Sequence, residues 1–493
     1  TQGRFFDQTS FRRINMKLYK LAPLSAICIA TLIASGCSSD SQKANETLSA
    51  QTMTVSQKAN PLATHGVVTS PNYLATQAGL DVLRRGGNAV DAAIATAATL
   101  TVVYPQMCTL GGDNFWLIYN AKTGELKALN ASGRSGSKAT IEFYKSKGFE
   151  KIPSRGYYAA NTVPGVVSGW DEAYKMSQKE MGSKYKWADI LKTPIDYAMN
   201  GFPVSTSLNF WTKVDIDPTD SEFRNLQRFP EFSKVFLKNG TDAYDVGEIL
   251  VQPDLANTLS LIAKKGAKEF YQGEIAKKIV ADLQANDGML SLEDFKNHHA
   301  DWVEPIHVNY RDTVAYNFPP NTQGMASLEI LNVLNNFDVK SLGEGTADYY
   351  HVIIEATKQA FADRDKYLTD PEFSDIPLDY LLSKDHGKDQ AKRISMEEAV
   401  DPKGDTIWLG VVDKDGNAVS LIQSIYHDFG SGIVPKGTGV ILQNRGSFFS
   451  LDPNHVNALM PHKRTFHTLN PAMMLKNGKP YLVYGTCLLY TSD

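Results

Sequence analysis

The potentially catalytic or ligand-binding residues of this sequence do not form a known metal-binding or nucleotide-binding motif. There is no His-Glu-x-x-His, no Cys-x-x-Cys and no Walker loop, so zinc and nucleotide chemistry have little support. Residues 413–417 (Asp-Lys-Asp-Gly-Asn) look like the start of a calcium loop, but Ala418 and Ser424 stand where an EF-hand requires glycine and a bidentate glutamate. Because strand-like segments flank these residues, they predict a hairpin turn.

Thr406 is a second candidate, because a hydroxyl can act as a nucleophile once a base takes its proton. It follows Gly404 and Asp405 and opens a segment rich in strand-forming residues. A threonine at the start of a strand is also what β-branching alone would predict. Taken by itself, Thr406 therefore does not separate a catalytic role from a structural one.

The elements that would position these residues alternate between helical and strand-like patterns. Residues 74–85 have the apolar spacing of a helix that Gly86 and Gly87 end, and Asn88 can cap an alanine-rich helix that follows. Residues 115–119 predict a strand, residues 121–124 a turn, and residues 166–300 are mostly helical.

The later part of the chain changes character. We expect an amphipathic helix over residues 349–367 and strands over residues 407–412, 418–425, 440–442 and 481–484. Helices that dominate early and strands that dominate late predict a layered α+β domain.

The composition excludes several classes of protein. The chain has 493 residues, and its 42% hydrophobic and 21% charged residues argue for a globular body and against disorder. A formal net charge of −4 and a pI of about 6.2 argue against a basic nucleic-acid binder. Four cysteines in a chain of this length do not make a disulfide framework, and Cys108, in an apolar stretch, is expected in the core.

The first 60 residues read as processing segments. Residues 1–15 lack periodicity and precede Met16, the expected start, and residues 16–36 have the charged, apolar and small-residue regions of a secretory signal. The segment resembles a bacterial lipoprotein signal, with Ala34 in place of the usual leucine, which implies a lipid on Cys37 and a membrane anchor in the periplasm. The alternative is a plain signal peptide. Residues 37–60 would form a polar tether.

Several independent stretches, in the same order along the chain, resemble the γ-glutamyltransferase family. Residues 86–93 (Gly-Gly-Asn-Ala-Val-Asp-Ala-Ala) match the family's most recognisable early stretch, and Asp405 and Thr406 with residues 411–420 match the start of its small subunit. The other matching stretches are residues 111–112, 130–134, 163–165, 355–364, 430–434, 463–464 and 469–472. The resemblance covers roughly residues 60–486.

The resemblance implies an N-terminal-nucleophile hydrolase with the α+β fold of a four-layer αββα sandwich. In that family the chain cuts itself before a threonine, here between Asp405 and Thr406, so that residues 61–405 and 406–486 become two subunits of a heterodimer. The freed α-amino group, with a pKa near ~8, can take the proton of the Thr406 hydroxyl. The threonine then forms an acyl-enzyme from the γ-glutamyl amide of a glutathione-like substrate, which water or an amino acid releases. No cofactor or nucleic acid is implied.

The family's substrate contacts carry over in part. Arg134 matches the arginine that grips the α-carboxylate of the glutamyl group, a task that suits a guanidinium, and an exposed loop arginine is the alternative. Ser424 stands in place of the threonine that orients the nucleophile's amine, and Tyr426 replaces an asparagine. His467 and Thr468 replace the usual serine pair, of which Thr468 keeps a hydroxyl donor.

Two further positions change the expected acyl specificity. Arg445 and Phe448 occupy the places of the glutamine and aspartate that contact the substrate, and phenylalanine cannot pair with an α-ammonium group. Residues 449–463 are too few for the lid loop of many members. These departures resemble the branch close to glutaryl-cephalosporin acylases, so we expect weak or inverted discrimination between γ-glutamyl and glutaryl amides.

The C-terminal end also departs from the family. Residues 487–493 (Cys-Leu-Leu-Tyr-Thr-Ser-Asp) resemble a translated sequencing adapter, so we expect the genuine sequence to break off at Thr486; the alternative is an ordinary tail. The family's oxyanion hole, a Gly-Gly pair, belongs where this sequence has Leu488 and Leu489. An inactive, lipid-anchored binding protein of the same fold and a structural envelope lipoprotein therefore stay open as alternatives.

Overall fold

The structure is a computed structural model of the chain and describes residues 62–220, 223–396 and 408–485. Cys37, Asp405, Thr406, the signal and tether segments and residues 486–493 lie outside the described residues. The chain divides into two compact units, Thr1–Leu62 and Ala63–Asp493, and every helix and strand below belongs to the second. Among the described helices, none combines the length and the apolar character needed to cross a bilayer.

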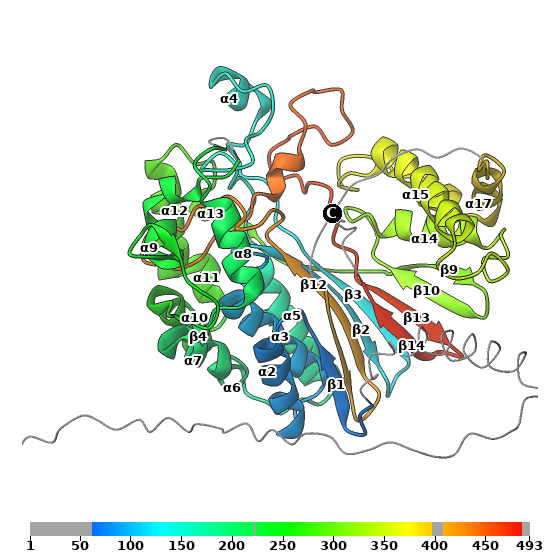
Figure 1. Ribbon diagram of the computed structural model, residues 1–493, viewed down its shortest axis with the longest axis horizontal. Coiled ribbons are helices and arrows are strands. Elements are labelled where there is room, and N and C mark those ends of the chain that lie inside the picture. The colour runs from blue at the N-terminus through cyan, green and yellow to red at the C-terminus, as the bar shows by residue number, and fades with distance from the viewer. Residues whose placement is uncertain (1–61, 221–222, 397–407, 486–493) are drawn as a thin grey trace, which may run out of the picture. The chain divides into compact units, whose positions relative to one another are not determined.

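A six-stranded antiparallel sheet has the order β1-β11-β12-β2-β3-β8 (Figure 1). Its strands are β1 (Gly66–Thr69), β2 (Asp113–Asn120), β3 (Glu125–Ala131), β8 (Asp301–Val303), β11 (Trp408–Asp413) and β12 (Ala418–Ser424). Two strands from late in the sequence, β11 and β12, thus lie between two from its beginning, β1 and β2. The register pairs Trp408 with Ile422 and Ser424 with Asp113, so the end of β12 lies beside the start of β2.

A second antiparallel sheet, in the order β14-β13-β10-β9, packs against one face of the first. Its strands are β9 (Ile306–Tyr310), β10 (Thr313–Asn317), β13 (Ala472–Lys476) and β14 (Lys479–Tyr484). Phe115 and Leu117 of β2 join Met473 and Leu475 of β13 in a hydrophobic cluster between the sheets, whereas Trp116 belongs to the cluster on the helical side. All of β2 is buried, because successive side chains point to opposite faces and both faces are covered.

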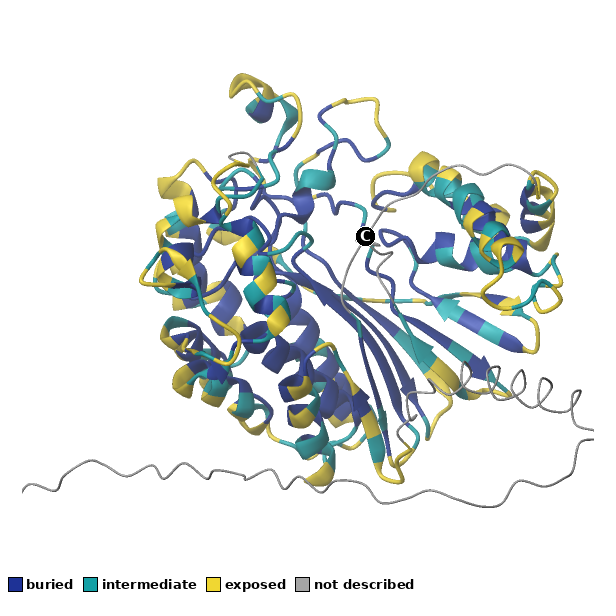
Figure 2. Cartoon of the chain, viewed as in Figure 1, coloured by how far each residue is buried: buried dark blue, intermediate teal, exposed yellow. Residues whose placement is uncertain are grey.

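Helices cover the other face of the six-stranded sheet (Figure 1). α3 (Ala89–Val103) packs on β11 and β12, and all fifteen of its residues are buried. Its alanines allow close approach, and the hydroxyls of its three threonines donate to backbone carbonyls of the same helix. α2 (Tyr73–Arg84) and α5 (Val166–Glu180) flank it. Figure 2 shows the burial that results, which is continuous through the inner helices and the sheet.

The remaining helices form two groups. The first group, with α2, α3 and α5, comprises α6 (Trp187–Ile190), α7 (Lys192–Asn200), α8 (Thr206–Asp215), α9 (Pro230–Phe236), α10 (Pro253–Lys265), α11 (Lys268–Gln272), α12 (Glu274–Ala285) and α13 (Leu292–Asn297). The short helix α4 (Ile141–Ser146) lies apart from this group (Figure 1). The second group comprises α14 (Gly324–Leu334), α15 (Ala347–Tyr367), α16 (Leu378–Leu381) and α17 (Lys384–Ala391), and α14 packs on β9 and β10. Short elements are β4 (Phe202–Pro203) paired with β7 (Ile249–Leu250), β5 (Leu237–Lys238) paired with β6 (Asp242–Ala243), and the 3-10 helices η1 (Leu226–Arg228) and η2 (Arg445–Phe448).

Most of the predicted elements are confirmed, and one is wrong. Asn88 caps α3 and forms a capping box with Asp91, and the predicted helix over residues 349–367 lies within α15. The apolar run at residues 440–442 is not a strand, because it makes only one isolated bridge, between Leu442 and Gly111. Gly439, with a φ of 66°, turns the chain just before this run, which is buried by packing and not by a strand ladder.

The turn at residues 413–417 is confirmed as the hairpin between β11 and β12, and its carboxylate has a use other than calcium binding. Asp413 Oδ1 accepts the N–H groups of Asp415 and Asn417, and Oδ2 accepts the N–H of Ala89 at 2.9 Å. Ala89 is the first residue of α3, where a carboxylate satisfies an unpaired donor and the positive end of the helix dipole. The turn therefore fixes α3 on the sheet.

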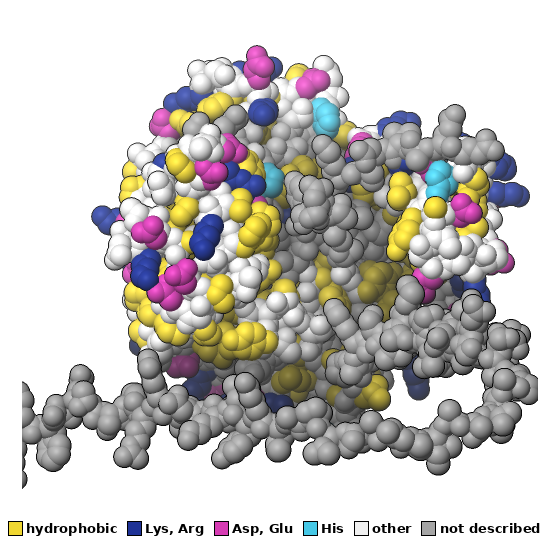
Figure 3. All heavy atoms as spheres, in the orientation of Figure 1, with side chains coloured by type: hydrophobic (Ala, Val, Ile, Leu, Met, Phe, Trp, Pro, Cys, Tyr) yellow, Lys and Arg dark blue, Asp and Glu magenta, His cyan; other side chains and the backbone are white. Residues whose placement is uncertain are grey.

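Charged side chains of both signs are mixed over the helical part of the face in Figure 3. Some form pairs within one helix, such as Lys175 with Asp171 and Glu172 on α5, at 2.7 and 2.8 Å. Exposed pairs of this kind contribute at most about 1 kcal/mol each. Stability therefore depends on the buried layers, not on these surface charges.

Candidate active site

The turn after β12 carries two of the predicted site residues. Ser424, the last residue of β12, is buried opposite Asp113, and its Oγ accepts the N–H of Tyr426 at 2.9 Å. Tyr426 has a φ of 81°, a conformation that costs a non-glycine residue energy and persists only where packing enforces it. Its ring stacks on His427 and on Phe448, with centroid distances of 3.9 and 4.3 Å. These stacks hold the strained turn.

Arg445 is a fully buried guanidinium beside these rings. Its Cζ lies 4.5 Å from the ring centroid of Tyr426 and 5.5 Å from that of Phe448. Its Nη1 donates to Thr468 Oγ1 at 3.1 Å. The ring of Phe466, 4.3 Å from Phe448, extends the aromatic surface. A guanidinium held on aromatic faces is a fixed positive charge, which favours anionic groups and disfavours ammonium groups nearby.

His467 is adjacent to Thr468 in sequence but contacts a different group. Its Nε2 lies 3.1 Å from Asp113 Oδ2, and its ring packs edge-on against Phe115. Burial and the positive charge of Arg445 lower the pKa of His467 to about 4, against the opposing effect of Asp113. The imidazole is therefore neutral at pH 7.

Asp113, at the start of β2, is a buried carboxylate that organises the loop on the other side of the site. Its Oδ1 accepts the N–H groups of Gly133 and Gly165, each at 3.0 Å. Gly133 has no room for a side chain, since a Cβ would lie 1.5 Å from the carbonyl oxygen of Val163. Because Gly133 precedes Arg134, Asp113 fixes the backbone that presents this arginine.

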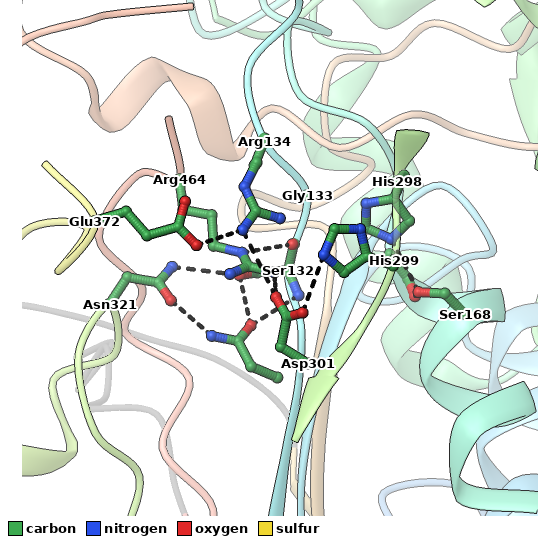
Figure 4. A network of polar contacts seen from close by, with 12 residues as sticks. Ser132, Gly133, Arg134, Ser168, His298, His299, Asp301, Asn321, Glu372 and Arg464 are labelled. Atoms are coloured by element: carbon green, nitrogen blue, oxygen red, sulfur yellow. Dashed lines mark hydrogen bonds and ion pairs between the residues drawn. The ribbon is translucent and has the colours of Figure 1, made fainter. Parts of the chain in front are cut away.

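Arg134 lies in a network of charged groups (Figure 4). Its Nη2 is 2.7 Å from Glu372 Oε1 and 3.7 Å from Asp301 Oδ2. Asp301 also pairs with Arg464 Nη2 at 2.5 Å and with His299 Nε2 at 3.1 Å. Two guanidiniums thus share the Asp301 carboxylate, and the exposed Glu372 supplies the negative charge closest to Arg134.

Arg134 also borders a pocket of about 320 Å³, whose walls include His298, His299 and His462. His298 Nε2 lies 2.9 Å from Ser168 Oγ, and burial lowers the pKa of His298 well below its usual value, so this imidazole is neutral at pH 7. Arg134 is therefore the permanent positive charge that an anionic ligand would meet in this pocket.

A buried ion network supports the turn after β12 from outside the site. Arg155 Nη1 donates to the carbonyls of Asp428 and Gly430, and its Nη2 lies 2.9 Å from Asp428 Oδ2 and 3.5 Å from Asp215 Oδ1. Arg224 contacts the same two carboxylates at 2.7 and 3.2 Å. Burial and the neighbouring Asp428 carboxyl raise the pKa of Asp215. The positive charges of Arg155 and Arg224 offset the repulsion between the buried carboxyl groups of Asp215 and Asp428.

Replacing Arg155 by methionine is expected to lower the free energy of unfolding by about 3–5 kcal/mol, because it leaves buried charge without its partner. The Arg155 side chain is only 1% exposed, so water cannot compensate. Urea unfolding followed by tryptophan fluorescence measures the change. Lys175→Met, in an exposed pair, is the matched control and should change little. Equal effects for the two variants would contradict this account.

Comparisons with known proteins identify the family of this chain. The sequence profile of the family described as Gamma-glutamyltranspeptidase matches residues 75–487, most of the chain. The chain belongs to the γ-glutamyltranspeptidase family. The family predicted from the sequence motifs is thereby confirmed, and with it the assignment to an enzyme class of hydrolases and acyltransferases with a fold of mixed helices and strands.

Similar members of the γ-glutamyltranspeptidase family come from several bacteria. The glutathione hydrolase-like YwrD proenzyme of Bacillus subtilis is 47% identical over 429 residues, which cover 86% of this chain and 79% of that protein. The oxamate amidohydrolase proenzyme of Klebsiella pneumoniae is 41% identical over 431 residues, with the same shares. The crystal structure of cephalosporin acylase from Bacillus halodurans superposes with a TM-score of 0.78 at 40% identity, covering 86% of this chain and 78% of that one.

In this γ-glutamyltranspeptidase-family chain the structure brings some of the predicted site residues together. Arg445 contacts both Tyr426 and Thr468, and Ser424 lies in the same turn as Tyr426. Arg134 instead makes its ion pairs in the network of Figure 4. The proposed roles of all these residues stay predictions.

Three acidic residues of this region were not found by sequence reasoning. Asp113 directly follows Gly112 of a matched stretch, so the family resemblance offered a signal for it. Asp301 and Glu372 lie far from Arg134 in sequence and carry no local pattern that points to it. Only the three-dimensional structure shows that both carboxylates form ion pairs with Arg134.

Proposed function

We propose that this protein is a self-cleaving hydrolase and acyltransferase that opens the amide bond of γ-glutamyl or closely related acyl groups through an acyl-enzyme on Thr406. Cleavage between Asp405 and Thr406 would free the α-amino group that takes the proton of the Thr406 hydroxyl. The hydroxyl oxygen attacks the amide carbonyl, and the leaving amine takes a proton. Water or an amino acid then releases the acyl group.

The observation that supports this proposal is that β12, which ends at Ser424, pairs with the first described residues of β11, and that Tyr426 in the next turn contacts Arg445. Thr406 is two residues before Trp408, the first described residue of β11, and two residues of chain span at most about 7 Å. Trp408 pairs with Ile422, so Ser424 lies beyond that pair in the direction from which the chain arrives. The position of Thr406 in the sequence, just before β11, is therefore compatible with the proposed nucleophile.

We also propose that the layers form the four-layer αββα sandwich of N-terminal-nucleophile hydrolases. Support comes from α3 on the outer face of one sheet, the hydrophobic cluster between the two sheets, and α14 on the outer face of the other. A lipid on Cys37 and a periplasmic location belong to the same proposal, and they are supported by the sequence of residues 16–37 alone.

A second candidate, a glutaryl-type acylase, is favoured by one specific observation. Arg445 puts a fixed positive charge, and Phe448 an apolar ring, at positions where the resemblance expects contacts to the substrate's α-ammonium. An acyl group that carries a carboxylate but no amino group avoids this repulsion. The names of two similar proteins, an oxamate amidohydrolase and a cephalosporin acylase, agree with this chemistry.

The deciding experiment is a denaturing gel of the purified chain, with N-terminal sequencing of the smaller band. A fragment that starts at Thr406 would establish the nucleophile and the processing site together. A folded chain that stays in one piece and turns over no amide would favour an inactive binding protein of the same fold. Parallel kcat/KM values for γ-glutamyl and glutaryl anilides decide between the two candidate acyl groups.

Replacing Glu372 by glutamine is expected to lower KM about 2–5-fold for substrates that carry a free carboxylate, with kcat little changed. The Glu372 carboxylate, 2.7 Å from Arg134 and 57% exposed, competes with the substrate for the guanidinium, and an exposed pair of this kind is worth roughly 0.2–1 kcal/mol. Asp375→Asn removes an exposed carboxylate from the same loop and is the matched control. A higher KM would mean that Glu372 positions Arg134 and does not compete for it.

A further inference from the structure

A cluster of potential metal ligands lies in the second helix group, apart from the residues discussed above. Glu329 of α14, Asp363 of α15 and His386 of α17 each offer one ligand atom, and these atoms lie within 4.8 Å of one another. His386 Nε2 is 2.7 Å from Asp363 Oδ2. Three separate helices thus converge on one point, which a single local sequence pattern could not reveal.

A fourth side chain, Gln390 of α17, reaches into the same cluster. Its Nε2 lies 2.8 Å from Asp363 Oδ2 and 3.5 Å from Glu329 Oε2, and the side chain is 1% exposed. Within the described part of the chain, Gln390 Oε1, Glu329 Oε1 and His386 Nδ1 are buried without a hydrogen-bond partner. Turning the amide over would direct its oxygen, a metal ligand, to the place its nitrogen now occupies.

Unpaired polar atoms in such a place are costly. Glu329 is fully buried and lies close to the Asp363 carboxylate. Each buried acceptor that lacks a partner costs about 1–3 kcal/mol, and more where the group is charged. A cation at the centre of the cluster would offset the negative charge of the carboxyl groups and give the oxygens of Glu329 and Gln390 a partner.

We propose that Glu329, Asp363 and His386, with the Gln390 amide oxygen as a fourth ligand, bind one divalent transition-metal ion of the zinc type. Because the three ligand atoms lie no more than 4.8 Å apart, a point between them is at most about 2.8 Å from each, whereas zinc bonds to nitrogen and oxygen measure about 2.0–2.2 Å. Side-chain adjustments of less than 1 Å, roughly, therefore close the shell.

The donor set favours zinc over calcium or magnesium. An imidazole nitrogen suits zinc and its neighbours in the transition series, whereas the harder ions take oxygen ligands alone. Three or four protein ligands without room for a large hydration shell also suit a small tetrahedral ion. The site is structural in this account, because it is buried among helices.

A metal ion here would join helices that border the candidate active site. Gln323 immediately precedes α14, and its N–H donates to the carbonyl of His467 at 2.8 Å. Arg364, next to Asp363 on α15, donates to Gln323 Oε1 at 3.2 Å. Fixing α14 against α15 would therefore steady the segment that carries His467 and Thr468.

The test uses the full chain, stripped with a chelator and dialysed into a buffer that does not bind metals, and titrated with zinc chloride. We expect one equivalent of zinc by calorimetry and by elemental analysis after gel filtration, and a higher Tm with zinc. Glu329→Gln and His386→Gln should each weaken binding by more than about 100-fold, beyond what losing an outer-sphere partner costs. Glu329→Gln keeps the size and shape of the side chain, so it should fold.

His299→Gln is the matched control, because it removes an exposed histidine that lies 3.1 Å from an aspartate, Asp301. It should keep the full zinc stoichiometry and the zinc-dependent rise in Tm. Failure of the wild-type chain to retain zinc, or unchanged affinity in both Glu329→Gln and His386→Gln, would overturn the proposal. The cluster would then be a pair of carboxyl groups that share a proton. None of these readouts depends on enzymatic activity.

Discussion

Thr406→Ala is expected to leave the chain in one piece and to abolish amide hydrolysis. Without the hydroxyl there is no atom to attack the preceding carbonyl, and no acyl-enzyme can form with a substrate. Removing a nucleophile of this kind lowers kcat on the order of 10⁴–10⁶-fold. Processing is measured as the fraction of cut chain on a denaturing gel over several days, and turnover with a γ-glutamyl or glutaryl anilide.

Thr406→Ser is the control for this prediction. It keeps the hydroxyl and the α-amine, so it should still be cut and retain part of the activity. A Thr406→Ala chain that is nevertheless cut between Asp405 and alanine, or that turns over substrate within tenfold of wild type, would exclude Thr406 as the nucleophile. Circular dichroism of both variants separates lost chemistry from lost folding.

The second large effect is expected from Arg445→Gln combined with Phe448→Asp. This change removes the buried positive charge and places a carboxylate near the predicted position of the substrate's α-ammonium group. A hydrogen bond that involves charged groups is worth about 1.5–3 kcal/mol. The ratio of kcat/KM for γ-glutamyl over glutaryl amide should therefore rise about 100-fold relative to wild type, which we expect to favour glutaryl or to discriminate weakly.

The matched control is Arg84→Gln, since Arg84 is an exposed arginine of α2 that pairs only with Asp81 among the described contacts. Its substrate ratio should equal that of wild type. Phe448→Asp alone tests the aromatic side chain, which is half-buried and more tolerant of replacement than Arg445. A wild-type enzyme that already prefers γ-glutamyl amides by orders of magnitude would contradict the predicted role of both residues.

Local sequence patterns predicted the individual helices, strands and turns of this fold better than they predicted which elements pack together. The helix cap at Asn88, the turn at residues 413–417 and the buried position of Cys108 all follow from short-range rules, and the structure confirms them. The strand predicted over residues 440–442 was wrong because an apolar run indicates burial and not a particular secondary structure. A loop that is covered by other elements is buried as well as a strand is.

Candidate site residues could be predicted only where they fall within a stretch that resembles the family. Tyr426, Arg445 and Thr468 were predicted as site residues from their positions in the motifs, and the structure then showed that Arg445 contacts the other two. Asp301 and Glu372 reach Arg134 from segments distant in sequence, so no spacing rule could connect them. Ion pairs between segments distant in sequence depend on the three-dimensional packing of the chain. A single sequence shows no local pattern from which they can be predicted.

The strand order has a consequence for the timing of maturation. β11 and β12 follow Thr406 in sequence but lie between β1 and β2, which precede it, and β13 pairs with β10. Two polypeptides made separately would have to open a finished sheet to insert a pair of strands. If the chain is cut before Thr406 as proposed, we therefore expect it to fold first and to be cut afterwards. The two pieces of a chain cut in this way would be held along three strand interfaces, so we expect that dilution does not separate them.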